Sequence, residues 1–225
     1  MINSKKAAIE TNRIQTTNIK PCTVEIVFFD FGGVLAEEGY RDGLIAIAKL
    51  NNINPQQFLK TAVDVTFKEG FVTGRIDEKT FWQTLREQTN INGSDEEFRN
   101  EVLSRFELRP WMMNWIKKLK KFHIRLAILS DQTKWLDELD MKYGFFQWFD
   151  GVFNSYHIGK CKREPAIFDY VLAEMNIKPD QALFVDDNQG NIQRANEKGL
   201  HTIHYQNRKD FERELLLFYP FLKDS

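Results

Sequence analysis

The sequence predicts an α/β fold in which a parallel β-sheet is covered by helices on both faces. Two observations lead to this prediction. From residue 110 onward, short apolar runs typical of buried strands alternate with longer amphipathic stretches typical of helices. Strand–helix–strand alternation of this kind is typical of parallel sheets. In addition, a segment with helical periodicity, residues 37–107, separates the first strand from all the others, which predicts an inserted domain.

The strands are expected at five short runs rich in β-branched and aromatic residues: Val24–Phe29, Ile124–Leu129, Gly151–Ser155, Ala182–Val185 and His201–Tyr205. Helices are expected between them, at Pro110–Phe122, Thr133–Tyr143, Pro165–Met175 and Asn188–Lys198. Parallel sheets bind ligands beyond the carboxyl ends of their strands. The residues that follow these strands are therefore the first candidates for a functional site.

The inserted segment is expected to form four helices, near Tyr40–Asn51, Pro55–Lys68, Asp77–Thr89 and Ser94–Phe106. Ser94 followed by Glu97 matches a capping box, and Asp77 is expected to cap the third helix. We therefore divide the chain into a flexible N-terminal tail, a core and a helical insertion, at residues 1–23, 24–36 with 108–225, and 37–107.

Composition narrows the range of functions. The 225 residues hold 31 Lys and Arg against 32 Asp and Glu, a net charge of -1 that argues against a nucleic-acid-binding protein. No apolar run approaches the roughly 18–20 residues of a membrane span, and residues 1–23 carry no apolar secretory segment. Cys22 and Cys161 form neither a disulfide framework nor a zinc motif. We expect a cytoplasmic protein, monomeric or dimeric, that binds neither nucleic acid nor membrane.

Polar and charged residues gather at the expected strand ends and in the loop after the third strand: Asp30, Ser130, Asp131, Lys162, Arg163, Asp186 and Asp187. Gly32 and Gly33 would let backbone N–H groups approach an anion closely. Converging carboxylates repel one another unless a cation lies between them, and Mg²⁺ shared with a substrate phosphate fits this set. A carboxylate can then attack phosphorus, because Mg²⁺ and Lys162 neutralise the opposing charge. Each residue alone is also an ordinary turn, cap or surface residue, but their joint occurrence in this order favours one site.

The segments IVFFDFGGVL, LAILSD, GKCKREPAIF and ALFVDDNQGNI, in this order, resemble the four motifs of the haloacid dehalogenase-like (HAD) hydrolase superfamily. The resemblance extends from Val24 to Tyr205. It implies a Rossmann-like core, with the insertion as an α-helical cap over the site. It also implies a Mg²⁺-dependent, phosphatase-like hydrolase of a small phosphorylated metabolite, for which a sugar phosphate is one candidate.

The resemblance also implies a role for each matching residue. Asp30 would be the nucleophile that forms an aspartyl-phosphate, and Ser130 and Lys162 would contact the phosphoryl group. The metal would be held by Asp30, the carbonyl of Gly32, Asp186 and Asp187. Further contacts to phosphate or substrate are expected from Gly32, Gly33, Asp131 and Arg163, and Asn191 would support the acidic loop.

The chain departs from the family pattern at two positions. Gly32 stands where a second Asp usually acts as general acid and base, a role typically worth about 10²–10⁴-fold in rate. Arg163 stands where a Pro commonly follows the Lys. Gly32 alone favours a catalytically weak HAD-fold binding module. A metal-independent haloacid dehalogenase is another alternative, against which Asp186 and Asp187 argue. A phosphoacceptor receiver domain is excluded by the order of the motifs and by the insertion.

Overall fold

The computed structural model describes residues 24–223, so the tail expected for residues 1–23 lies outside the described part. Five strands form one sheet in the order β3-β2-β1-β4-β5, and every neighbouring pair is parallel. The strands are β1 (Ile26–Phe29), β2 (Arg125–Ser130), β3 (Gly151–Asn154), β4 (Ala182–Asp186) and β5 (His201–His204). The predicted parallel α/β fold is therefore confirmed.

Strand β1 lies in the middle of the sheet and is buried on both faces. All four of its residues are fully buried. Val27 and Phe29 belong to the apolar cluster on one side of the sheet, whereas Ile26 and Phe28 belong to the cluster on the other. This double burial explains why β1 is continuously apolar rather than alternating. Asp30, the next residue, is thereby held at the centre of the sheet's carboxyl edge.

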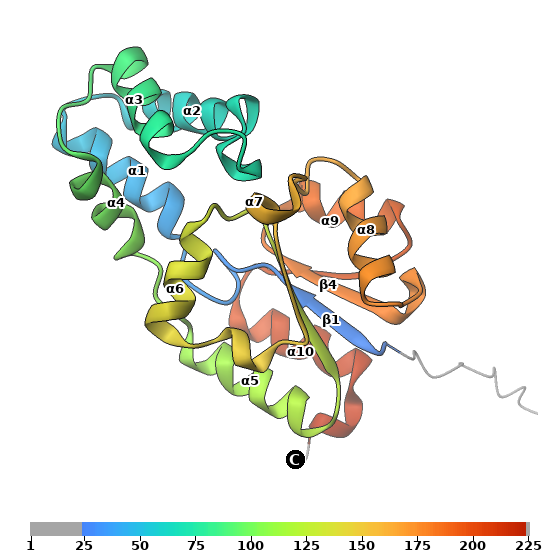
Figure 1. Ribbon diagram of the computed structural model, residues 1–225. Helices are drawn as coiled ribbons and strands as arrows, with labels where there is room; N and C mark the ends of the chain where they lie inside the picture. Colours follow the sequence, from blue (N-terminus) through green and yellow to red (C-terminus); the bar gives the residue numbers. More distant parts are fainter. Residues whose placement is uncertain (1–23, 224–225) are drawn as a thin grey trace, which may run out of the picture.

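Helices cover both faces of the sheet, as Figure 1 shows. One face is covered by α5 (Pro110–Lys121), α6 (Trp135–Tyr143) and α10 (Arg208–Phe218). The other face is covered by α8 (Ala166–Glu174) and α9 (Gln189–Glu197). Four of these helices match the expected ranges to within two residues. Helix α10 and the short α7 (Ser155–Ile158) were not expected from the sequence.

The insertion between β1 and α5 contains the four expected helices, which Figure 1 shows as a lobe at the upper left. Their bounds are α1 (Gly39–Leu50), α2 (Pro55–Asp64), α3 (Glu78–Thr89) and α4 (Asp95–Leu103). The capping predictions are confirmed, since Asp77 accepts a hydrogen bond from the backbone N of Thr80 and Ser94 forms a capping box with Glu97. Helix α2 was expected to reach Lys68. It ends at Asp64 instead, and the chain continues as a π-helical turn over Val65–Glu69.

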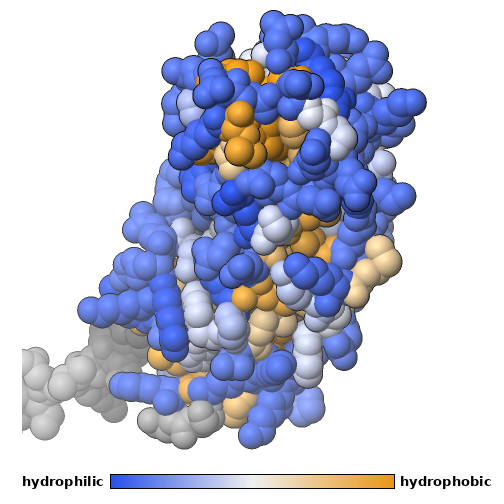
Figure 2. Space-filling model, turned by 90° about the vertical axis from the view of Figure 1, so that its left-hand side faces the viewer, coloured by the Kyte–Doolittle hydropathy of each residue, from blue (hydrophilic) through white to orange (hydrophobic). Residues whose placement is uncertain are grey.

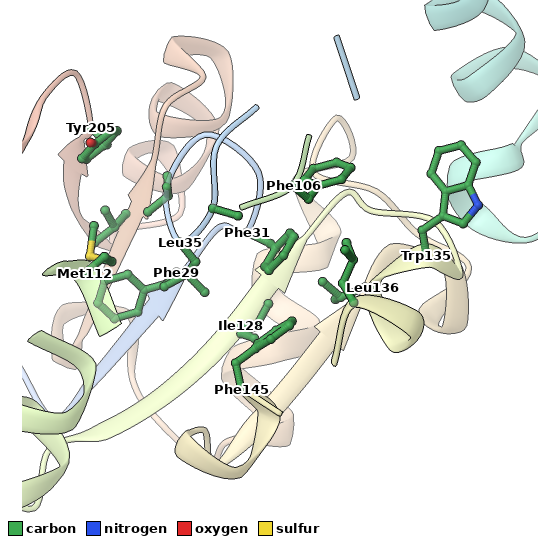
Figure 3. Packing of buried hydrophobic residues seen from close by; sticks show 14 of the residues in the cluster. Phe29, Phe31, Leu35, Phe106, Met112, Ile128, Trp135, Leu136, Phe145 and Tyr205 are labelled. Atoms are coloured by element: carbon green, nitrogen blue, oxygen red, sulfur yellow. The ribbon is translucent and has the colours of Figure 1, made fainter. Parts of the chain in front are cut away.

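Aromatic side chains join the insertion to the core. Trp135, at the start of α6, contacts the rings of Phe71, Phe81 and Trp82, with centroid separations between 5.4 and 6.5 Å. Its indole N–H also donates to Glu78 of the insertion at 2.9 Å. Figure 3 shows Trp135 extending from α6 toward the helices of the insertion. The insertion is therefore packed on the core and not only connected to it by the chain.

The chain enters and leaves the insertion through a neck, which we define as residues 35–37 and 107–109. Its two segments are hydrogen-bonded to each other: the N–H of Glu37 donates to the carbonyl of Glu107, and the N–H of Arg109 donates to the carbonyl of Leu35, both at 2.9 Å. Ala36 and Leu108 also form an isolated antiparallel bridge. The chain therefore crosses between core and insertion at one place, next to the end of β1.

The outer surface agrees with the mixed charge of the sequence. Figure 2 shows one face that is mainly hydrophilic, with small apolar patches among the polar groups. Within residues 24–223, no helix combines the length and the apolar character needed to cross a membrane.

Candidate active site

A cavity of about 620 Å³ lies between the insertion and the carboxyl edge of the sheet. The core lines it with Asp30, Gly32, Ser130, Asp131, Lys162, Arg163 and Asp187, and the insertion with Glu38, Tyr40, Val63, Thr66, Phe67 and Phe106. Strands β1, β2 and β4 are neighbours in the sheet, so the residues at their ends converge. Two predicted site residues, Gly33 and Asp186, do not line the cavity.

Lys162 lies under the floor of this cavity between two carboxylates. Its side chain is only 1% exposed, and its Nζ lies 2.6 Å from a carboxylate oxygen of Asp30 and 2.6 Å from one of Asp186. Burial alone would lower the pKa of Lys162, but the charges of Asp186 and Asp30 raise it above its ordinary value. Lys162 therefore stays positively charged and holds both carboxylates.

Three carboxylates crowd together around this single lysine. Asp30, Asp186 and Asp187 each place an oxygen within 4.8 Å of the others. Burial raises the pKa of Asp30 well above its usual value, and the charges of Asp186 and Asp187 add to this effect, while Lys162 opposes it. Burial, together with the charge of Asp186, likewise raises the pKa of Asp187. Because one lysine cannot balance three carboxylates, the cluster has the excess negative charge and the oxygen donors that suit a divalent cation.

The two neighbouring aspartates at the end of β4 have different environments. Asp186 is fully buried and accepts hydrogen bonds from Lys162, from the backbone N of Asn188 at 2.7 Å and from the Asn191 side chain at 3.1 Å. Asp187 lines the cavity and keeps an accessible side chain there, although the surrounding protein desolvates its carboxylate. Asp186 thus fixes Lys162 and the loop that follows β4, while Asp187 is the member of the pair that a ligand in the cavity can reach.

Gly33 is required for the position of Asp187. Its φ of +77° is in the left-handed region, and a Cβ at this residue would lie 2.3 Å from Oδ2 of Asp187. Only glycine lets the loop after β1 approach the loop after β4 this closely. We expected Gly33 to contact the phosphate, but the structure places it behind Asp187 and outside the cavity lining.

Asp131 and Arg163 line the cavity but are also engaged in contacts of their own. Oδ1 of Asp131 accepts hydrogen bonds from the Ser155 hydroxyl at 2.7 Å and from the backbone N of Lys162 at 2.8 Å. Asp131 therefore ties the loop that carries Lys162 to the end of β2. The guanidinium of Arg163 lies 3.4 Å from the centroid of the Phe67 ring, a cation–π contact between core and insertion.

Three residues of the site region were missed by sequence reasoning. Arg194 donates to the carbonyl of Lys162 and to the Asn191 side chain, both at 2.6 Å, and its position three residues after Asn191 on a helix was an available signal. Arg109 donates to the carbonyls of Gly33 and Val34 and pairs with Glu37. No local pattern indicated Arg109, because its partners lie more than 70 residues away in the sequence.

Glu38 is the third missed residue. It caps helix α1, because its Oε1 accepts a hydrogen bond from the backbone N of Arg41 at 3.0 Å, and it also lines the cavity. Burial raises the pKa of Glu38, and the charge of Asp187 contributes to the increase. The only signal in the sequence was its place soon after the glycine pair.

Comparison with known proteins bears directly on this arrangement. The family model of the haloacid dehalogenase-like hydrolases matches residues 24–197. The chain belongs to this family. The predicted resemblance is therefore confirmed, and with it the assignment of the protein as a hydrolase.

Proteins of known function or structure resemble this chain over most of its length. A D-ribitol-5-phosphate phosphatase from Bacteroides thetaiotaomicron is 25% identical over 201 residues, which cover 85% of this chain and 97% of that protein. A crystal structure of a HAD family enzyme from the same species has a TM-score of 0.73 at 21% identity, covering 85% of this chain and 98% of the other. A complex of that enzyme with magnesium and inorganic phosphate has a TM-score of 0.68 at 21% identity, covering 81% and 94%. These similarities confirm the Rossmann-like α/β fold of this HAD hydrolase.

Proposed function

We propose that this HAD hydrolase is a Mg²⁺-dependent phosphatase that hydrolyses a small phosphorylated metabolite through an aspartyl-phosphate on Asp30. The observation that carries the proposal is the cluster of Asp30, Lys162 and Asp187 at the floor of the cavity, with Ser130 beside it. The named relative supports the same type of reaction, since it is a phosphatase of a phosphorylated pentitol.

The residues present fit a magnesium ion. Asp30 and Asp187 would hold it, together with the backbone carbonyl of Gly32, and Asp186 would contribute its charge from behind. The three carboxylates already lie within 4.8 Å of one another and exceed the charge of Lys162. When bound, the ion would neutralise this charge and the charge of the phosphate. The magnesium and phosphate complex of the B. thetaiotaomicron enzyme, which shares this fold, supports the proposal.

Asp30 is oriented for attack on phosphorus. One of its oxygens accepts a hydrogen bond from the backbone N of Phe31 at 2.7 Å, and the other pairs with Lys162. The side chain is 13% exposed, so the cavity reaches it. In the proposed reaction an oxygen of Asp30 bonds to phosphorus, while the bond from phosphorus to the ester oxygen breaks. Ser130 and Lys162 would hold the phosphoryl oxygens during this transfer and during the hydrolysis of the aspartyl-phosphate.

The carboxylate cluster also argues against a metal-independent dehalogenase. Such an enzyme needs one carboxylate nucleophile and gains nothing from two further carboxylates beside it. Burial raises the pKa of Asp30, and the charges of Asp186 and Asp187 add to this effect, so the cluster works against the ionisation of Asp30 unless a cation is present.

The walls of the cavity indicate the size and character of the substrate. A volume of about 620 Å³ is within the range of about 300–1,000 Å³ typical of small-molecule sites. Most of the polar groups lie at the end formed by the core, whereas the insertion contributes Tyr40, Val63, Phe67 and Phe106 together with Glu38 and Thr66. The cap expected from the sequence would thus choose the organic part of the ester. A sugar phosphate is the first candidate to test, because the named relative acts on ribitol 5-phosphate.

The proposal is tested by phosphate release from sugar phosphates, nucleotides and an aryl phosphate, with Mg²⁺ and with EDTA. We expect Mg²⁺-dependent turnover that falls by more than about 10³-fold in Asp30→Asn. Asp42→Asn, which removes an exposed carboxylate from helix α1, is the matched control. Asp30→Asn as active as the wild type would refute the mechanism. Phosphate binding without turnover would favour the binding module, and halide release from a 2-haloacid in EDTA would favour the dehalogenase.

A further inference from the structure

The space beside Gly32 is occupied by a carboxyl group from another part of the chain. A Cβ built on Gly32 would lie 3.6 Å from Oε2 of Glu38 and 3.3 Å from the ring of Phe106. The backbone at Gly32 is not in the left-handed region, so the absence of a side chain there has no conformational cause. The region that a longer side chain at position 32 would enter is therefore bounded by the ring of Phe106 and by the carboxyl group of Glu38.

We propose that Glu38 is the general acid and base of this phosphatase, taking the place of the carboxyl group that Gly32 lacks. Glu38 lines the same cavity as Asp30. Its Oε1 is fixed by the hydrogen bond from the backbone N of Arg41. Its Oε2 has no hydrogen-bond partner among residues 24–223 and is the oxygen that lies near Gly32. One oxygen thus anchors the group, while the other remains available to a ligand.

The other acidic groups of the cavity have contacts that tie them to other parts of the site. Oδ1 of Asp131 accepts two hydrogen bonds that hold the loop of Lys162. Asp30 and Asp187 belong to the carboxylate cluster. The hydroxyl of Tyr40 contacts that of Thr66. Asp131, like Glu38, keeps a second carboxylate oxygen without a hydrogen bond among the described residues. Glu38, however, is the acidic residue whose free oxygen lies beside Gly32, and this position lets it exchange a proton with the leaving group.

The inference rests on the proposed phosphatase function and completes its two steps. As an oxygen of Asp30 bonds to phosphorus and the ester bond breaks, the departing oxygen takes the proton from Oε2 of Glu38 and leaves as an alcohol. In the second step, Glu38 removes a proton from water as the water oxygen bonds to phosphorus. The bond between phosphorus and Asp30 then breaks. Inorganic phosphate is released, Asp30 regains its carboxylate, and Glu38 is again protonated.

The test compares an alkyl phosphate with p-nitrophenyl phosphate in Glu38→Gln. Glutamine keeps an oxygen that can accept from the N–H of Arg41, so the start of helix α1 is preserved while proton transfer is lost. We expect kcat for the alkyl ester to fall by about 10²–10⁴-fold. The rate of the initial nitrophenol burst from the aryl ester should fall far less, because nitrophenolate leaves without needing a proton. Asp42→Asn, on the exposed side of the same helix, should leave both esters unchanged.

Restoring an acid at position 32 provides a second readout. In the Glu38→Gln background, Gly32→Asp should raise kcat for the alkyl ester by at least about tenfold, because it returns a general acid to the site. In the wild-type background, Gly32→Asp should gain less than this, because Glu38 already supplies the proton. A gain of about 10²–10⁴-fold in the wild type would show that the site lacks an acid and would overturn the inference, even if Glu38→Gln does not fold.

Two further outcomes separate the inference from the function on which it rests. An active wild type whose Glu38→Gln variant loses alkyl-ester turnover and the nitrophenol burst equally, or loses neither, would overturn the role of Glu38 and leave the phosphatase intact. A wild type that hydrolyses neither ester with Mg²⁺ present would overturn the proposed function and the inference together.

Discussion

Replacing Gly33 by Ala tests whether the close approach of two loops fixes the carboxylate of Asp187, a proposed metal ligand. Gly33 has a φ of +77°, and the added Cβ would lie 2.3 Å from Oδ2 of Asp187. That separation is about 1.1 Å shorter than an ordinary contact of 3.4 Å. The carboxylate of Asp187 must therefore move by about an ångström in Gly33→Ala. Because Mg²⁺ binds oxygen ligands at about 2.0–2.1 Å and tolerates little distortion, this movement would remove one of the proposed ligands.

The size of the effect follows from two separate contributions. A left-handed Ala costs about 1–2 kcal/mol, of which the loss of freedom in the unfolded chain returns about 0.4–1 kcal/mol. The net loss of about 1 kcal/mol lowers the melting temperature by about 2–4 °C in a chain of this size. Displacement of Asp187 adds a specific effect, which we expect to weaken Mg²⁺ binding by about 10–100-fold, the usual range for disturbed metal surroundings.

Gly144→Ala is the matched control. Gly144 ends helix α6 with a φ of +63°, and its Cβ would meet only the end of the Gln147 side chain, at 3.6 Å. Both variants should lose similar thermal stability in EDTA, but only Gly33→Ala should weaken Mg²⁺ binding in calorimetric titration and raise the Mg²⁺ concentration needed for phosphate release. Equal Mg²⁺ affinities in the two variants would refute the argument that Gly33 positions Asp187.

Three further predictions concern charge and contact in the site. Lys162→Met leaves Asp30 and Asp186 without their shared positive charge, and breaking a buried ion pair costs about 3–5 kcal/mol. The melting temperature in EDTA should therefore fall by about 10 °C, and an unchanged melting temperature would contradict the ion pairs. Burial raises the pKa of Asp30 in the folded protein. Protonated Asp30 therefore stabilises the fold below the ordinary aspartate pKa of about 4, and this stabilisation is lost as the pH rises through the raised pKa. Urea unfolding in EDTA should therefore show a larger loss of stability from pH 5 to pH 8 in the wild type than in Asp30→Asn, and equal losses would show that Asp30 titrates normally. Arg163→Ala and Phe67→Ala should each raise KM, and a double-mutant cycle on the free energies derived from KM should give a coupling energy of about 0.5–1 kcal/mol. Additive effects of the two substitutions would show that the contact between Arg163 and Phe67 does not contribute to binding.

The parts of the fold that could be predicted are those set by local sequence. The capping residues Asp77 and Ser94 and the proline at 110 start their helices where expected. Helix α10 escaped prediction because it opens with charged residues, and its apolar side is defined by distant contacts. Its Phe211 packs on Phe29 of β1, with ring centroids 6.4 Å apart.

The predictable part of the site follows the same logic. Residues at or directly after strand ends, such as Asp30, Ser130 and Asp187, converge because parallel strands end at one edge. The rest depends on how the neck folds. Arg109 reaches Gly33, and Glu38 reaches the space beside Gly32, only because residues 35–37 pair with residues 107–109. That pairing links positions about 70 residues apart, and no local sequence pattern in either segment predicts it.

The neck also divides the protein into an insertion that can vary in sequence and a core that holds the reacting groups. Because the two crossings are hydrogen-bonded to each other, the helices beyond them can change while Asp30 and Lys162 stay in place, as long as the contacts of Trp135 with the insertion are kept. Substrate preference and bond-breaking chemistry can then evolve as independent modules. Glu38 is the exception, since it lies one residue past the neck, on the side of the replaceable part. Any graft of a foreign insertion onto this sheet would have to retain Glu38, or restore a carboxyl group at position 32, to keep a proton donor beside the departing alcohol.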